Sequence, residues 1–308
     1  MRKSNLTTLF FLTAFFSLLA LGIQAQLHVE NLDLVHLLKD SKTIVFMPAA
    51  DTAKHHQYRE LLEKHWSYTE LEFHSYKQYL RNKEEQGYSF LLFGDDHIKS
   101  DISESNYLYW ELWTWYAPNG DWNQKKKILF ARLEFYPDPE TTFNPSNIYD
   151  YRFDTEGHIM NWTPGMFKNY VQELQDLIAN EEERSINKFY VEPDDLAKLK
   201  TETLYIPDYV LEQYNANLVS QGKISASELM ADYPYEYKVV DNKTLSDLIL
   251  NTEKPLHYLL FVRSNSDKYI SIVEGHSGEI LYTRYTPISF SVKKQDIKKL
   301  VRTMERGY

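Results

Sequence analysis

The chain repeats one pattern, and this repeat constrains its fold more than any other feature. The segment Ile128-Leu129-Phe130-Ala131-Arg132 returns as Ile280-Leu281-Tyr282-Thr283-Arg284, and similar strand and helix patterns surround both copies. These patterns give the two halves of the chain the same order of elements. We therefore predict a tandem duplication of one α/β unit.

The elements of the predicted unit follow from hydrophobic periodicity. Short apolar or alternating runs predict strands, and apolar residues spaced by three and four predict helices. Strands are expected in the first half at 43–48, 68–76, 89–93, 107–116 and 127–136, and in the second at 203–207, 235–241, 257–261, 268–274 and 279–285. Amphipathic helices over 167–178 and 297–304 close the two halves, and a helix broken at Gly222 is expected over 209–230. Further helical segments are expected around 58–66, 78–80 and 245–249. Each half thus reads β-α-β-α-β-β-β-α, which predicts a mixed sheet covered by helices.

A charged segment separates the halves. Residues 180–195 include Glu181-Glu182-Glu183-Arg184, which is typical of a boundary and also of the exposed end of a helix. We place the first domain at 26–188 and the second at 189–308. A helix also restarts after Ser225, because Ser225-Ala226-Ser227-Glu228 has the pattern of a capping box.

The amino-terminal segment predicts export. Arg2 and Lys3 precede an apolar stretch that ends before Gln26, as in a secretory signal peptide over 1–25, cleaved after Ala25. A membrane anchor is the alternative, but the apolar run is short for a span of about 20 residues. The chain has no cysteine, which excludes disulfides, thiolate metal sites, cysteine nucleophiles and lipidation at the signal. We expect a periplasmic or extracellular protein with no membrane span after cleavage.

No motif points to catalysis, a cofactor or a metal. Nucleophile elbows, Walker loops and dinucleotide turns are missing from a chain that has only ten glycines, and the acidic net charge of -10 disfavours nucleic acid as a partner. The clustered histidines His55, His56, His65 and His74 fit no zinc motif. Carboxylate pairs that meet only in space stay open, so we lean against an enzyme without excluding one.

Two stretches are candidate binding sites. Asp95, Asp96 and His97 follow a predicted buried strand, where α/β proteins often bind ligands, although a solvated loop is the simpler interpretation. The strand over 107–116 carries aromatic residues on both faces, and one face presents Tyr107, Tyr109, Trp113 and Trp115. An exposed stripe of rings would suit a sugar or a partner protein. The alternative is that the closing helix or the second domain covers it.

The second half resembles a known family. Tyr237-Lys238-Val239-Val240-Asp241 and the turn Ser277-Gly278-Glu279 are similar to the amino-terminal domain of TolB and to the related domain of curli-secretion lipoproteins. The first half departs from this pattern at Asn119-Gly120-Asp121, and the β-propeller of TolB is missing. The resemblance implies a non-catalytic binding or assembly module of the bacterial cell envelope, with an envelope protein as partner. The alternative is a carbohydrate-binding or carbohydrate-active protein that uses the aromatic strand and binds a glycan.

Overall fold

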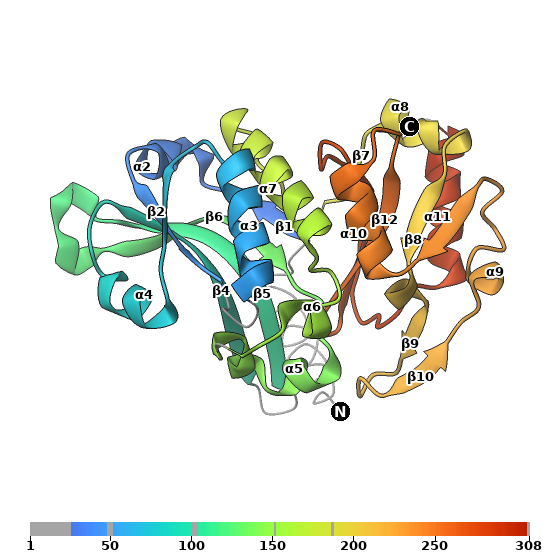
Figure 1. The fold of residues 1–308 in the computed structure, drawn as a ribbon, viewed down its shortest axis with the longest axis horizontal. Coiled ribbons are helices and arrows are strands. Elements are labelled where there is room, and N and C mark those ends of the chain that lie inside the picture. The colour runs from blue at the N-terminus through green and yellow to red at the C-terminus, as the bar shows by residue number, and fades with distance from the viewer. Residues whose placement is uncertain (1–25, 48–51, 100–103, 151, 186–187, 307–308) are drawn as a thin grey trace, which may run out of the picture.

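Two mixed six-stranded sheets with covering helices make up the protein. The computed structural model describes residues 26–47, 52–99, 104–150, 152–185 and 188–306, so the predicted signal peptide lies outside the described residues. Figure 1 shows the two sheets side by side, the first half in blue to green and the second in yellow to red. The predicted α/β class with mixed sheets is confirmed.

The first half follows the predicted order from its second strand onward. Its elements are β1 (Leu27–Val29), η1 (Leu32–Leu34), α2 (Val35–Lys39), β2 (Lys42–Phe46), α3 (Thr52–His65), β3 (Glu70–Phe73), α4 (Tyr76–Asn82), β4 (Tyr88–Lys99), β5 (Glu104–Tyr116), η2 (Pro118–Gly120), η3 (Trp122–Gln124), β6 (Lys126–Glu134), α5 (Pro139–Phe143), η4 (Pro145–Tyr149), α6 (Thr155–His158) and α7 (Pro164–Ala179). β5 and β6 form an antiparallel pair, and Asn119 and Gly120 in the connection between them have positive φ angles. Strand β1 was not predicted.

The second half differs from its prediction between the strands expected at 203–207 and 235–241. Its elements are β7 (Tyr190–Val191), α8 (Pro193–Leu196), η5 (Ala197–Lys200), β8 (Leu204–Pro207), η6 (Asp208–Leu211), β9 (Glu212–Tyr214), β10 (Ser220–Lys223), α9 (Ala226–Leu229), β11 (Tyr237–Val240), α10 (Asn242–Asn251), β12 (His257–Ser264), β13 (Asp267–Glu274), β14 (Ile280–Thr286) and α11 (Lys294–Arg306). The helix predicted over 209–230 is wrong, because a two-stranded ribbon of β9 and β10 occupies most of that range. The predicted restart at Ser225 is confirmed: its hydroxyl accepts a hydrogen bond of 3.2 Å from Glu228 N at the start of α9.

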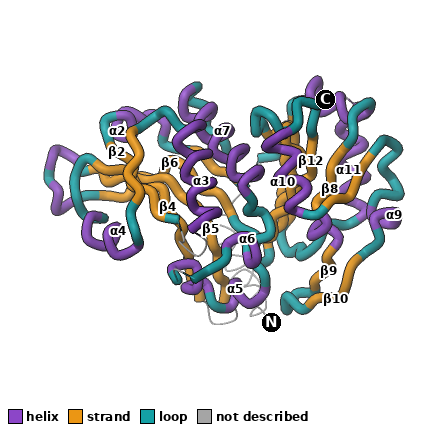
Figure 2. The backbone as a smooth tube through the Cα atoms, in the orientation of Figure 1, coloured by secondary structure: helices purple, strands orange, loops and turns teal. Residues whose placement is uncertain are grey.

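The two sheets have the same strand order. The first runs β1-β6-β5-β4-β2-β3 and the second runs β7-β14-β13-β12-β8-β11, and Figure 2 shows both as orange layers. In each sheet two parallel pairs lie at one end, while antiparallel pairs form the rest. This common order is what a duplication would produce, but the duplication itself stays a prediction.

The strand registers correct the alignment of the repeat by one residue. The ladder between β5 and β6 skips Phe130, and the ladder between β13 and β14 skips Leu281. The sequence repeat matches Phe130 with Tyr282 instead. Since a shift of one residue moves a side chain to the other face of a sheet, Arg132 and Arg284 match in sequence but do not occupy equivalent places in the two sheets.

Helices cover both faces of the first sheet. On one face, α3 and α7 pack over Leu91, Trp110 and Leu112, within a core that continues into the second half. On the other face, residues of α4 and η4 pack on a smaller cluster made of Ile44, Phe46, Phe90, Leu92 and Trp113. The second face is the one that carries the charged residues described below.

Helix α7 joins the two halves. Figure 1 shows it between the sheets beside α10. At its start, Gly165 N donates a 2.9 Å hydrogen bond to Ser246 Oγ of α10. One turn later, Asn169 Nδ2 donates to Gly275 O over 3.0 Å, and a Cβ on Gly278 would lie 2.4 Å from Asn169 O. Gly165 and Gly278 therefore let the backbone of α7 approach that of the second half closely, which holds the two halves in contact.

Candidate functional site

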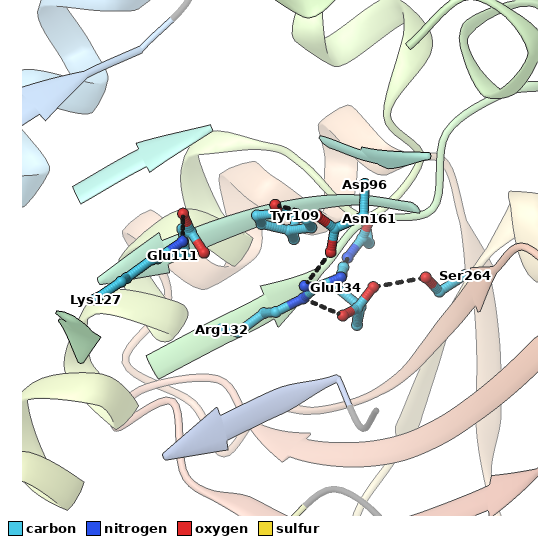
Figure 3. Close-up of polar contacts among 8 residues, drawn as sticks. All are labelled: Asp96, Tyr109, Glu111, Lys127, Arg132, Glu134, Asn161 and Ser264. Carbon is cyan, nitrogen blue, oxygen red and sulfur yellow. Dashed lines mark hydrogen bonds and ion pairs between the residues drawn. The ribbon is translucent and has the colours of Figure 1, made fainter. Parts of the chain in front are cut away.

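Charged side chains gather on the first sheet at the face that α4 covers. The ladders of β4, β5 and β6 place Leu92, Glu111 and Arg132 side by side, and Gly94, Tyr109 and Glu134 one step further. Alternate residues of a strand share a face, so these polar groups continue the apolar surface of Leu92 toward the second half. Figure 3 shows this network, which is the candidate functional site.

Gly94 makes room for the ring of Tyr109. A Cβ at Gly94 would lie 2.5 Å from Cε2 of Tyr109, so a side chain at this position would displace the ring. The ring in turn lies under the guanidinium of Arg132, whose Cζ is 3.6 Å from the ring centroid. This cation–π contact fixes both groups at the centre of the network.

Arg132 bridges two carboxylates. Its Nε donates to Glu134 Oε1 and its Nη1 donates to Asp96 Oδ2, each over 2.7 Å. The Tyr109 hydroxyl donates to the other oxygen of Asp96 over 3.0 Å. Since the side chain of Glu134 is fully buried and that of Asp96 is 45% exposed, the network runs from the interior to solvent.

The second half closes the network at Glu134. Ser264 Oγ, at the end of β12, donates to Glu134 Oε2 over 2.6 Å, so both carboxylate oxygens have partners. Asn161 Nδ2 donates to the main-chain oxygen of Glu134 over 3.1 Å, and Asn161 Oδ1 accepts from Tyr136 N over 2.7 Å. A fully buried charge is thus satisfied by groups from both halves.

A second ion pair lies next to the network. Lys127 Nζ donates to Glu111 Oε1 over 2.6 Å, and the same ammonium lies 5.0 Å from the ring centroid of Trp113. The Glu111 side chain is 9% exposed, whereas that of Lys127 is 40% exposed. Lys127 therefore neutralises a mostly buried carboxylate from the solvent side.

Burial sets the electrostatics of the site. It raises the pKa of Glu134, against the opposing effects of Arg132 and Ser264, and it raises the pKa of Glu111 against that of Lys127. Burial by itself lowers the pKa of Arg132, but the charges of its two carboxylates outweigh it and the pKa is raised. Arg132 therefore stays charged, and the pairs hold their carboxylates in place.

The structure places the three polar residues predicted after the buried strand in β4 itself. The predicted loop is wrong, because β4 pairs with β5 as far as Lys99. Asp96 joins the network, whereas Asp95 Oδ1 accepts a 2.7 Å hydrogen bond from the hydroxyl of Tyr149. His97 Nδ1 contacts Asn106 Oδ1 on β5. Only Asp96 of the three meets Tyr109 of the aromatic stripe.

The aromatic stripe is largely core. Tyr109 is 5% exposed and Trp113 is 4% exposed, and the Trp113 ring stacks on Phe90 with centroids 4.4 Å apart. Trp115 is half-buried and its Nε1 donates to Lys83 O over 2.6 Å, while Tyr107 is also half-buried. The stripe therefore offers no continuous exposed row of rings. Residues of α4 pack on it at Trp113, whereas the closing helix α7 packs on the other face of the sheet.

Sequence reasoning missed most of the network. Arg132, Glu134 and Lys127 lie within the strand predicted over 127–136, and Ser264 follows the strand predicted over 257–261, so the strand pattern by itself does not single them out. A signal was present: Arg132 and Glu134 alternate in an otherwise apolar strand, and Glu111 interrupts an aromatic one. Charges on the face of a buried strand require partners.

Comparison with known proteins adds no relative. No protein-family model, no curated protein and no solved structure matches the chain. Within the described residues, no helix is long and apolar enough to cross a membrane. In the same part of the chain, no three side chains of His, Asp or Glu are grouped so that they could hold a metal ion.

Proposed function

We propose that the chain is an exported, non-enzymatic binding or assembly protein of the bacterial cell envelope, and that it binds its partner in the cleft between its halves. One observation carries the proposal: a cleft of about 460 Å³ lined by both halves. Its lining residues are Gln57, Asp154, Glu156, Gly157, Thr163, Pro164, Asn242, Lys243, Ser246, Asp247 and Leu250. Junctions between domains are preferred places for binding sites.

The walls of the cleft are held in place. Asn242 Nδ2 donates a 2.8 Å hydrogen bond to Met160 O across the halves, beside the bond from Gly165 N to Ser246 Oγ. A site built this way needs little ordering when a ligand enters, which favours binding. The cleft lining carries three carboxylates, Asp154, Glu156 and Asp247, and one lysine, Lys243, so its charge favours basic partners over acidic ones.

The charged network supports a role without catalysis. A general acid or base has to reach a substrate, but Glu134 is fully buried with both oxygens bonded. Glu111 is mostly buried and is paired with Lys127. These carboxylates are used to fix strands and halves to one another.

Export and an envelope role rest on the sequence. The basic start and apolar stretch of residues 1–25 support secretion, and the resemblance of the second half to the TolB amino-terminal domain supports an envelope assembly role. The carbohydrate alternative depended on an open aromatic stripe. Because Trp113 stacks on Phe90 and is buried, its ring faces are not open to a sugar.

Photo-crosslinking from the cleft tests the proposal. A photoreactive residue replaces Lys243 in the cleft, and in a matched variant it replaces Lys238, an exposed lysine of β11 outside the cleft lining. The full chain is produced in its own cells and irradiated. We expect one reproducible protein adduct from position 243 and not from position 238, with a silent glycan array for the same protein. The same adducts from both positions, or none, would contradict the cleft; glycan binding would favour the alternative.

A further inference from the structure

A second concave site lies on the second half, between β14 and α11. It has a volume of about 420 Å³, and its lining residues are Arg284, Lys299, Arg302, Thr303 and Arg306. We call it the basic groove. Four of the five residues come from α11, where the spacings of three, four and seven place them along one face of the helix. Arg284 reaches the same groove from β14, so two separate elements contribute cations.

The positive charges of the basic groove are not balanced by neighbours. No carboxylate lines the groove, and in the described part of the chain none of its four cations has an ion pair. This is unusual for a chain with a net charge of -10. Lys268, by contrast, is buried nearby and bonds Asp296 of the same helix over 2.6 Å. Four like charges around one hollow repel one another and concentrate an attractive potential for anions.

The helix dipole explains only part of this arrangement. Cations near the carboxyl end of a helix are favourable, which accounts for Arg302 and Arg306. It does not account for Lys299, nearly two turns from the end, or for Arg284, which is not on the helix. Arg132 of the first sheet, at a place that is not equivalent, is held by two carboxylates. Arg284 has no such partner among the described residues.

The donor chemistry indicates the ligand. Guanidinium groups bind phosphate oxygens through two parallel N–H donors, and a lysine ammonium adds a point charge. The Thr303 hydroxyl donates to Lys299 O over 3.0 Å, so its proton is already used and the four cations supply the donors for a ligand. The volume exceeds that of a single ion and admits a phosphate with a small organic group. We propose that the basic groove binds a phosphate-bearing ligand, either free or on a lipid headgroup.

Titration calorimetry of the exported protein tests this proposal, which does not depend on the cleft between the halves. The probes are inorganic phosphate and pyrophosphate at constant ionic strength. Vesicles of phosphatidylcholine with phosphatidic acid, compared with pure phosphatidylcholine, test the lipid source by co-sedimentation. Arg302→Gln removes one cation from the groove at an exposed helix position, and Arg152→Gln removes an exposed arginine from the first half as a matched control.

We expect Arg302→Gln to weaken binding roughly tenfold or more, as the loss of a charge-assisted hydrogen bond predicts. Arg152→Gln is expected to bind like the wild type, and circular dichroism checks that both variants are folded. Binding of the small probes assigns a free phosphate ligand, and binding of only the acidic vesicles assigns a lipid headgroup; both support the groove. No binding of any probe, or equal weakening by the two variants, would overturn it.

Discussion

The Ser264 hydroxyl donates a 2.6 Å hydrogen bond to the buried carboxylate of Glu134, and this bond joins the two halves of the molecule. Glu134 lies at the end of β6 and Ser264 at the end of β12, so the contact connects the two sheets directly. The other oxygen of Glu134 is held by Arg132. The stability of the network is therefore coupled to the contact between the halves.

Replacing Ser264 by alanine is expected to destabilise the protein. The change leaves one oxygen of a fully buried carboxylate without its donor, which costs about 1 to 3 kcal/mol of the free energy of unfolding. Urea unfolding followed by tryptophan fluorescence measures it. Ser266→Ala, in the turn that follows β12, is the matched control and is expected to change stability by less than about 0.5 kcal/mol. Equal effects of the two variants would show that the bond to Glu134 contributes nothing.

The close approach of Gly278 to α7 gives a second prediction. Gly278 has a φ angle of +85°, and an added Cβ would lie 2.4 Å from Asn169 O and 2.8 Å from its Cα. Gly222 has a φ angle of +88° but no atom within 4 Å of an added Cβ. Gly222→Ala should therefore cost only the left-handed backbone penalty, about 1 to 2 kcal/mol. Gly278→Ala should cost clearly more in thermal and urea unfolding, and equal costs would mean that the halves are not held together at this turn.

The long elements of the fold were predictable because their signals are local. Apolar runs and three-four spacings predicted the order β-α-β-α-β-β-β-α, which the first half follows from β2 to α7. Strands β1 and β7 were not predicted, because segments of three and two residues are too short to show a hydrophobic period. These strands form only by pairing with β6 and β14. Such edge strands depend on tertiary contacts alone.

The helix predicted over 209–230 failed for a different reason. Its apolar start, Tyr209, Val210 and Leu211, is buried in a single turn of 3₁₀ helix instead of along one helical face. Leu218 and Gly222 have positive φ angles, which a continuous helix does not allow. The sequence predicts a break within a helix at Gly222, but this glycine lies in β10, a strand of the two-stranded ribbon.

The candidate site was only partly accessible to sequence reasoning. Asp96 and Tyr109 were singled out separately, and the ladder of β4 and β5 brings them together. Ser264 and Glu134 are 130 positions apart in the chain, so no local pattern connects them. The part of the site that could not be predicted is therefore the part that depends on the tertiary contact between the halves.

The burial of Trp113 leads to a prediction about stability. Trp113→Ala removes a large ring that stacks on Phe90 beneath α4, and such a deletion costs about 3 to 5 kcal/mol. Trp122→Ala, in the connection between β5 and β6, removes a more exposed indole and is expected to cost much less. Denaturant midpoints of both variants make the comparison. If Trp113→Ala unfolded at the wild-type midpoint, the ring would have to be outside the core.

A carboxylate on α7 predicts a dependence of stability on pH. Burial raises the pKa of Glu173 to about 7, although the charge of Arg184, its ion-pair partner, opposes the rise. The folded protein therefore retains a proton that the unfolded chain releases at its ordinary pKa of about 4.5. Between these values the folded state binds more protons, so this group's contribution to stability is full at low pH and is lost as the pH rises from about 4.5 to about 7.

Glu173→Gln isolates this contribution, because glutamine does not titrate. The free energy of unfolding of the wild type minus that of the variant is expected to fall by up to about 3 kcal/mol as the pH rises through this window. Urea unfolding at a series of pH values measures the difference, and subtracting the variant cancels the titration of the other groups. Glu182→Gln, at an exposed position after the same helix, controls for the loss of one negative charge. A difference that stays constant or rises with pH would mean that Arg184 outweighs burial and keeps Glu173 ionised in the folded protein.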